Sequence, residues 1–398
     1  MRIINKITDF SAREPSLGYY YQFLYSLFIL LKTDNRSAKI RIECLDDIVM
    51  FDKDKINLVQ TKLHIKGGAN LTDASPDFWK TIRVWVNNIN SGTLDINNST
   101  FSLITTEKIG EKSLLNCFVN KNNSTLFDTV DIIEKLNAIA IDSSNVTNKK
   151  AYEDFLLFDN DLKVKLIERI TIIDSSINTK EVINEINKIL RFSITIDKVE
   201  LLSDRVIGQW TVLCIRHLLE EFDSLSYIQI HNIITDLSES FKEDNLPDDF
   251  NEAIKISDEE LKTYEQKIFI KQLEILSLKT NSIIVKNAIS DFRRAYEQRS
   301  RWIRESLINI NDEENYNLKL IDEWNNLFAI LDDNCNSKIS EDELTRLSKE
   351  FYIDLFVKNS PQVYIRKNFN SNYMIRGSYH MLADKKEIGW HINFKDLI

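Results

Sequence analysis

Two neighbouring stretches decide the fold: residues 39–51, KIRIECLDDIVMF, and residues 56–65, INLVQTKLHI. Both are rich in isoleucine, leucine and valine, and apolar and polar residues alternate along the start of the first, as in a β-strand. The intervening residues 52–55, DKDK, are polar and predict a turn. We therefore expect two strands joined by a short connection.

The alternation of side chains along these strands places polar residues on common faces. Glu43 and Asp47 would share one face of the first strand, and Gln60, Lys62 and His64 one face of the second. Residues two apart on one face lie roughly 6 to 7 Å apart, so Gln60 and Lys62 can reach one phosphate-sized group.

The flanking sequence supplies helices and a further strand. Residues 19–31 are large and apolar and predict a buried helix. Ser75-Pro76-Asp77 has the pattern of a helix start, with serine at the N-cap and proline at the first helical position, and the helix should run to about Ile89. Residues 101–106, FSLITT, predict a third strand. This order predicts an α/β or α+β unit around a small sheet.

Beyond Asn120 the pattern becomes helical, with apolar residues at helical spacing separated by polar loops. The residues after Pro361 suggest a short strand-and-turn cap. We therefore predict an α+β protein with two domains, an N-terminal one at 1–118 and a mainly helical region at 119–398 that ends in this cap.

Composition limits the class of protein. The chain has 398 residues, 43% of them hydrophobic and 28% charged, as in a globular protein. Only 8 glycines and 4 prolines occur, which disfavours turn-rich β folds. The four cysteines lie far apart and look like reduced thiols, no apolar run reaches the roughly 20 residues of a membrane span, and no signal peptide is evident. We expect a cytoplasmic protein without membrane contact.

Net charge is distributed unevenly. The chain carries -10 in total, but residues 1–120 hold 15 basic and 13 acidic side chains, whereas residues 121–398 hold 36 and 48. The acidic excess therefore belongs to the C-terminal part, and the N-terminal domain can still present a basic groove to DNA.

An acid on one strand and Gln-x-Lys on the next suit metal-dependent hydrolysis of a phosphodiester. The carboxylate holds Mg²⁺, a further oxygen completes its shell, and the lysine stabilises charge on the phosphate and orients the attacking water. The same spacing also occurs on ordinary solvated strands, so this string alone leaves both interpretations open.

The order of three segments resembles a restriction-endonuclease-like (PD-(D/E)XK-type) nuclease core: residues 18–22 (GYYYQ), 42–47 (IECLDD) and 59–62 (VQTK). They resemble the nuclease domain of effectors in bacterial nucleotide-signalled (CBASS-type) and Lamassu-type anti-phage defence. Residues 205–210 (RVIGQW), 376–384 (RGSYHMLAD) and 388–391 (IGWH) resemble the C-terminal region of ABC-three-component proteins.

The resemblance implies roles for five residues. Asp47 corresponds to the metal-binding aspartate, Gln60 to the second-strand position and Lys62 to the catalytic lysine, while Glu43 and Gln22 are neighbours in the site. Asp47, Glu43 and Gln60 would hold Mg²⁺ (or Mn²⁺). Many relatives have Asp or Glu at the position of Gln60, which puts a second metal ion in doubt. A strand bulge would exchange Asp47 for Asp46.

The resemblance further implies a metal-dependent endonuclease that cuts double-stranded DNA, works with an SMC-like ATPase subunit and a third small subunit, and is active as a homo-oligomer, a dimer or tetramer. The alternative is a catalytically silent helical subunit of such a complex.

Three other patterns favour structural roles. Residues 332–343 resemble an EF-hand loop but have Ser337 where glycine is needed, so we favour an Asn/Asp loop followed by a helix capped at Ser340. The arginine-rich segment 293–304 is expected to pair with acids of its own chain. His217, His380 and His391 are expected to be structural, hydrogen-bonded histidines.

Overall fold

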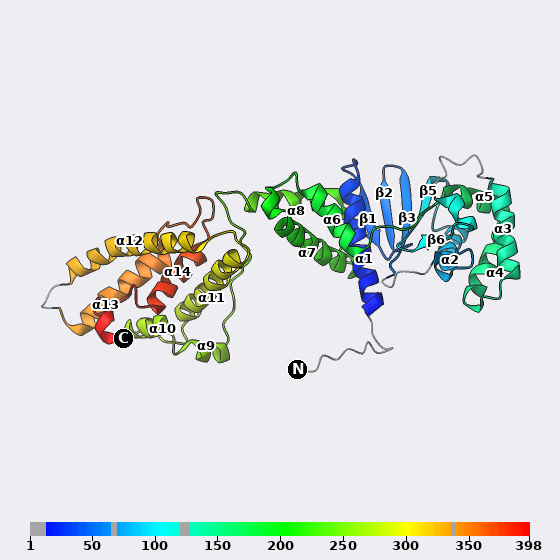
Figure 1. Ribbon diagram of the computed structural model, residues 1–398. Helices are drawn as coiled ribbons and strands as arrows, with labels where there is room; N and C mark the ends of the chain where they lie inside the picture. The colour runs from blue at the N-terminus through cyan, green and yellow to red at the C-terminus, as the bar shows by residue number, and fades with distance from the viewer. Residues whose placement is uncertain (1–12, 65–69, 120–127, 336–338) are drawn as a thin grey trace, which may run out of the picture. The chain divides into compact units, whose positions relative to one another are not determined.

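The computed structural model describes residues 13–64, 70–119, 128–335 and 339–398. The chain divides into two compact units, Met1–Ser238 and Glu239–Ile398 (Figure 1). Together they form an α+β protein, as the sequence predicts.

The first unit is built on a six-stranded mixed sheet with strand order β7-β5-β3-β2-β1-β8. Neighbours are antiparallel from β8 through β1 and β2 to β3, and parallel from β3 through β5 to β7. The strands are β1 (Lys39–Ile42), β2 (Ile48–Asp52), β3 (Lys55–Lys62), β5 (Ser99–Thr105), β7 (Ile170–Ile173) and β8 (Leu225–Ser226), and a separate two-stranded sheet pairs β4 (Asn70–Leu71) with β6 (Lys108–Ile109).

Helices cover both faces of the sheet (Figure 1). Helices α1 and α7 pack on one face, and α2 and α5 on the other, where α2 also packs on α4 and α4 on α3. The bounds are α1 (Arg13–Lys32), α2 (Pro76–Asn90), α3 (Thr129–Asp142), α4 (Lys149–Leu157), α5 (Asn160–Arg169), α6 (Thr179–Leu190), α7 (Val199–Leu218) and α8 (Tyr227–Ser240). The predicted helix start is confirmed, with Ser75 at the N-cap and Pro76 at the start of α2.

The stretch 39–51 is two strands and not one. β1 ends at Ile42, β2 begins at Ile48, and the two pair in a hairpin in which Ile42 lies opposite Ile48. The polar residues 43–47 form the connecting turn, so the predicted common strand face of Glu43 and Asp47 is wrong. A run of five residues containing three acids is poorly suited to a buried strand, and it is this run that makes the turn.

The division between the units lies after Ser238, later than the boundary predicted after residue 118. The segment between the two positions supplies both edge strands of the first sheet, β7 beside β5 and β8 beside β1. It also supplies α7, whose Trp210 indole donates to the carbonyl of Phe23 in α1 at 2.8 Å. His217 of α7 accepts from the N–H of Ile42 at 3.1 Å, as expected of a structural histidine.

The second unit is helical. Its elements are α9 (Asp258–Tyr264), α10 (Ile268–Ile275), α11 (Ile283–Arg304), α12 (Ile310–Asn334), α13 (Glu341–Phe351), the π-helical turn η6 (Tyr352–Lys358), α14 (Asn372–Asp384) and α15 (Phe394–Leu397). One apolar core contains residues from every one of these elements, and α14 packs closely against α11.

The predicted strand-and-turn cap is wrong, because residues 372–384 form the buried helix α14. Gly377 lies inside this helix, where it serves helix packing. A Cβ at this position would overlap the backbone carbonyl of Asp291 and the side chain of Ala295 in α11, so only glycine permits this close approach.

The two remaining sequence patterns are structural. Arg299 of α11 pairs with Glu313 at 2.8 Å and Arg301 with Glu305 at 2.8 Å, which confirms pairing within the chain. Asp332 belongs to helix α12, Ser337 lies outside the described residues, and Ser340 caps α13. In the part of the chain that the structure describes, no helix is long and apolar enough to cross a membrane.

Candidate active site

The β1–β2 turn is held in a fixed shape. The N–H of Glu43 donates to the carbonyl of Asp47 at 3.1 Å, which closes the turn. Glu43 adopts a left-handed backbone conformation with φ of 52°, which costs a non-glycine residue about 1 kcal/mol or more. Asn88 of α2 donates to the carbonyl of Leu45 at 2.7 Å and ties the turn to the helix.

The carboxylate of Asp47 is fixed to the neighbouring strand. Its Oδ2 accepts from the backbone N–H of Thr61 at 2.8 Å and from the Thr61 hydroxyl at 2.9 Å. Thr61 stands between Gln60 and Lys62, so these two bonds hold Asp47 beside the Gln-x-Lys string of β3. Among the described residues, Asp47 makes no hydrogen bond or ion pair with Gln60 or Lys62 themselves, and the Thr61 side chain lies on the opposite strand face from both.

Asp46, the alternative ligand, is placed differently. Its Oδ2 accepts from the indole N–H of Trp85 in α2 at 2.5 Å, and its Oδ1 accepts from the N–H of Asp47 at 3.0 Å. Burial, and then the nearby charge of Asp47, raises the pKa of Asp46 to about 7, although both hydrogen bonds act in the opposite direction. Asp46 therefore anchors the turn to α2, whereas half-buried Asp47 retains access to solvent.

Glu43 and Gln22 are neighbours, as predicted, although they come from the turn and from α1. Partial burial of the carboxyl and the charge of Asp47 raise the pKa of Glu43, while a hydrogen bond from Gln22 and the charge of Lys62 lower it. The pKa of Glu43 thus depends on three of the other four candidate residues, Gln22, Asp47 and Lys62. Burial is the larger cause of this raised pKa and the charge of Asp47 the second, so the two carboxylates of the turn lie close together.

Gln60 and Lys62 are the two candidate residues on β3. Gln60 is buried at 6% exposure and lies opposite Leu103 of β5, whereas Lys62, at the end of the strand, is half-buried. Leu58, two residues earlier on the same strand face, belongs to the core cluster that contains Trp85, so Gln60 and Lys62 face the side of α2.

The oxygen atoms of this group suit a hard divalent cation. Asp47 and Glu43 supply carboxylates, and the buried Oε1 of Gln22 has no hydrogen-bond partner among the described residues. Mg²⁺ and Mn²⁺ prefer oxygen ligands of these types, and a cation would offset the surplus negative charge. The residues present therefore fit the implied ion.

A second cluster lies near the end of β3, at His64. His64 Nε2 is 2.8 Å from Asp77 Oδ2, and His64 Nδ1 is 3.5 Å from Glu107 Oε1. One nitrogen and two carboxylate oxygens within 4.8 Å of one another could hold a metal ion. The hydrogen bond between His64 and Asp77 also ties the end of β3 to α2, and the contact of His64 with Glu107 ties it to the end of β5.

Asp77 and Glu107 were not among the predicted site residues. The signal for them is topological, since β3 and β5 are parallel and end at the same edge of the sheet, Lys62 opposite Thr105. The residues that follow the two strands therefore come together there, and the sequence gives no indication that the strands are neighbours.

Comparison with known proteins identifies one region. Residues 269–398 match the model of C-terminal domain 7 (CTD7) of the ABC-three component (ABC-3C) systems. This supports the predicted resemblance of the C-terminal region to ABC-three-component proteins. The predicted motif at 205–210 lies outside the matched residues. No curated protein matches the chain.

Among solved structures, the chain is similar to the Cap4 SAVED/CARF-domain containing receptor of Acinetobacter baumannii with the cyclic trinucleotide 3'3'3'-cAAA, at 17% identity and a TM-score of 0.33, over 59% of this chain and 46% of the receptor. The Moraxella osloensis Cap4 receptor gives 18% identity and a TM-score of 0.31, over 56% of this chain and 48% of the receptor. The chain thus spans less than half the length of these receptors, and likenesses of this size do not establish a common function.

Proposed function

We propose that this protein is a metal-dependent endonuclease that cuts double-stranded DNA as the effector of a bacterial anti-phage defence complex. The CTD7 match of residues 269–398 supports membership of an ABC-three-component assembly. The nuclease activity, the Lamassu-type context and the SMC-like ATPase partner belong to the proposal. The restriction-endonuclease-like assignment of the first unit is part of it as well.

A single observation carries the nuclease assignment: the bonds from Thr61 to Asp47 Oδ2 at 2.8 and 2.9 Å. They fix an accessible carboxylate against the strand that bears Gln60 and Lys62. A helix, three antiparallel strands, a second helix and a parallel strand, α1-β1-β2-β3-α2-β5, surround this point, in keeping with the nuclease core that the sequence resembles.

The residues would divide the work. Asp47 and Glu43 would hold the cation, with Gln60 and Gln22 as neutral oxygen donors. When bound, Mg²⁺ would act as a Lewis acid toward the phosphate and lower the pKa of a water molecule. The ammonium of Lys62 stabilises the negative charge that develops on the phosphate, a contribution that typically raises the rate by about 10² to 10³.

The test is incubation of the purified full chain with supercoiled plasmid in Mg²⁺, Mn²⁺ or EDTA. We expect nicked and linear DNA with either ion and intact DNA in EDTA. Absence of cutting by the chain alone calls for the same assay with the neighbouring ATPase subunit added. Intact plasmid in both assays would contradict the nuclease assignment.

The CTD7 match also favours a second candidate, a catalytically silent subunit whose helical region docks the ATPase. This subunit would form the complex but leave DNA intact. In a co-purification assay with the ATPase, Lys62→Ala should bind as the wild type does under both hypotheses, so only the cleavage assay separates them.

We further propose that activation is a change of assembly. A cut through both strands needs two active sites, so a monomer bound to its partners would be inactive and a released even-numbered homo-oligomer active. Light scattering on the active fraction tests this. Double-strand cleavage by a strictly monomeric species would contradict the regulation and leave the nuclease assignment intact.

A further inference from the structure

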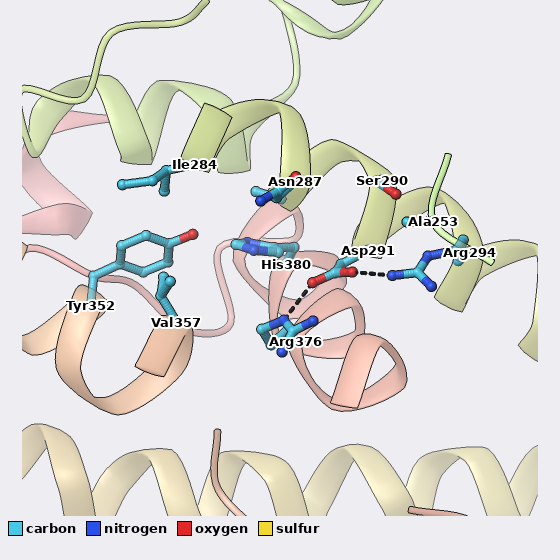
Figure 2. A pocket seen from close by; sticks show the side chains of 11 residues that line it. Ala253, Ile284, Asn287, Ser290, Asp291, Arg294, Tyr352, Val357, Arg376 and His380 are labelled. Carbon is cyan, nitrogen blue, oxygen red and sulfur yellow. Dashed lines mark hydrogen bonds and ion pairs between the residues drawn. The ribbon is translucent and has the colours of Figure 1, made fainter. Parts of the chain in front are cut away.

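The second unit contains a cavity of about 310 Å³ beside the contact between α11 and α14 (Figure 2). It is bordered by Asp291 and Arg294 of α11, by Arg376 and His380 of α14, and by Tyr352 at the start of η6. A volume near 300 Å³ is at the small end of the range for ligand-binding pockets. π-helical turns such as η6 are frequent at functional sites.

The charges at this cavity do not balance. Asp291 is 4% exposed and uses both oxygens, Oδ1 with Arg294 Nη2 at 2.5 Å and Oδ2 with Arg376 Nε at 2.5 Å. The described lining residues thus contain two guanidinium groups and one carboxylate. One positive charge remains without an acid in the lining, and Arg376 carries it on a side chain that is 28% exposed.

Two residues that line the cavity also have buried polar atoms whose hydrogen bonds are unmade. His380 is 3% exposed, and its Nδ1 has no partner among the described residues. The same holds for the buried Nε of Arg294. Burial, with the charge of Arg376, lowers the pKa of His380 to about 3, so the ring is neutral at pH 7. A buried polar atom without a partner is costly, which a bound group or water relieves.

Apolar groups form the remaining wall. In Figure 2, Ile284, Tyr352 and Val357 gather on one side of His380, and Asp291 lies with the arginines on the other. The cavity therefore offers a charged end and an apolar end, which is the pattern of a site for a small amphiphilic molecule.

We propose that this cavity binds a small organic anion, a carboxylate or a phosphate monoester with a compact apolar body. The anionic oxygens pair with the guanidinium of Arg376, Nδ1 of His380 makes a further hydrogen bond to the ligand, and the apolar body packs against Ile284 and Val357. Guanidinium groups bind carboxylate and phosphate with matched geometry. The proposal does not depend on nuclease activity in the first unit.

Calorimetric titration of the full chain with phenyl phosphate, benzoate and benzyl alcohol tests the proposal. The first two probes distinguish phosphate from carboxylate, and the third has the apolar body without a charge. We expect one saturable site for at least one anion and none for benzyl alcohol. Arg376→Gln should weaken anion binding about tenfold or more, because a charge-assisted hydrogen bond is lost.

Arg293→Gln is the matched control. Arg293 is on the same helix, pairs with exposed Glu260 at 3.3 Å and does not border the cavity, so its loss should leave binding within about twofold. If Arg376→Gln does not fold, Ala253→Trp keeps every charge while a large side chain enters the cavity from an exposed lining position, and it should abolish binding. No saturable binding of either anion to the wild type, equal binding of benzyl alcohol, or equal effects of Arg376→Gln and Arg293→Gln would each overturn the proposal.

Discussion

The two units each contain a cluster of charged residues, and the surplus has opposite sign. In the first, Glu43, Asp46 and Asp47 lie near one lysine, Lys62, and burial with mutual repulsion raises the pKa of Asp46 to about 7. In the second, one buried aspartate lies between two arginines. Because unbalanced charge in a folded protein is costly, the first cluster favours a cation and the second an anion.

The two units also use histidine differently. Ile42 N–H donates to His217 Nε2, and His217 Nδ1 lies 2.9 Å from the carbonyl of Phe222, so both ring nitrogens are used. His380 is equally buried but keeps Nδ1 without a described partner. A histidine whose two ring nitrogens are both hydrogen-bonded has a structural role. A buried histidine with an unpaired ring nitrogen beside a cavity indicates a place for a ligand.

The largest expected effect is on the first cluster. Lys62→Ala should slow plasmid cleavage by about 10² to 10³, because charge on the phosphate is no longer stabilised. Lys55→Ala is the control, since Lys55 is exposed at the other end of the same strand and should leave the rate unchanged. Equal cleavage rates for Lys62→Ala and wild type would contradict a catalytic role for this cluster.

The next effect concerns the helix contact that carries the second cluster. Gly377→Ala should lower the free energy of unfolding in urea by about 3 kcal/mol, because the added Cβ overlaps the backbone of Asp291 and α11 must shift. Gly208→Ala in α7 is the control, where a Cβ meets nothing within 4 Å, and should instead stabilise the protein by about 0.5 to 1 kcal/mol. The same sign for both changes would show that Gly377 is not needed for the contact.

Acidification should destabilise the protein through His380 of the second unit. The pKa of His380 is lowered in the folded state to about 3, against roughly 6.5 when unfolded, so below pH 6.5 the unfolded chain binds a proton that the folded chain does not. The contribution of His380 to the free energy of unfolding is therefore fully present above pH 6.5. It falls as the pH decreases, by about 2 kcal/mol between pH 7 and pH 5.

His380→Phe should lack this part of the pH dependence in urea unfolding series at pH 7, 6 and 5. The exposed His231 serves as the control, and His231→Phe should follow the wild type. Parallel curves for wild type and His380→Phe would mean that His380 takes up a proton as readily in the folded protein as in the unfolded chain, contrary to a lowered pKa.

The smallest effect is on the bond that positions Asp47. Thr61→Val removes the hydroxyl bond to Asp47 Oδ2 but keeps the backbone N–H bond, so the free energy of unfolding should fall by about 1 kcal/mol and cleavage should slow modestly. Thr61→Ser keeps the hydroxyl and should behave as wild type. Loss of activity in Thr61→Ser but not in Thr61→Val would point to packing of the threonine methyl group and not to its hydroxyl.

Much of the first unit was predictable because its elements have strong local signals. The run rich in isoleucine, leucine and valine that forms β3 and the Ser75-Pro76 start of α2 are examples. The strands β7 and β8 were missed, since they are 4 and 2 residues long and their partners lie far away in sequence. Helix α14 was missed because Gly377 is explained only by its contact with α11.

The candidate site could be predicted in part for a similar reason. Asp47 lies directly before β2, and Gln60 and Lys62 lie on β3, which a short connection joins to β2, so their proximity follows from the local pattern. The His64, Asp77 and Glu107 cluster depends on β5 lying beside β3, and the cavity of the second unit depends on two helices whose sequences lie about 80 residues apart, as the pair Asp291 and Arg376 shows. Neither neighbourhood is visible in the sequence alone.

The late position of β7 and β8 has a consequence for how this protein is made. When a ribosome has released β1, β2, β3 and β5, the growing chain has four strands of the main sheet with both edges unpaired, and unpaired edges invite pairing with other chains. The edges are covered only after Ile173 and Ser226 emerge, which at roughly 5 to 20 residues per second takes about 5 to 20 seconds more. During that interval, a chaperone or a helix packed over the open edges would limit such pairing. Truncated chains that end near residue 118 would remain in this open state permanently.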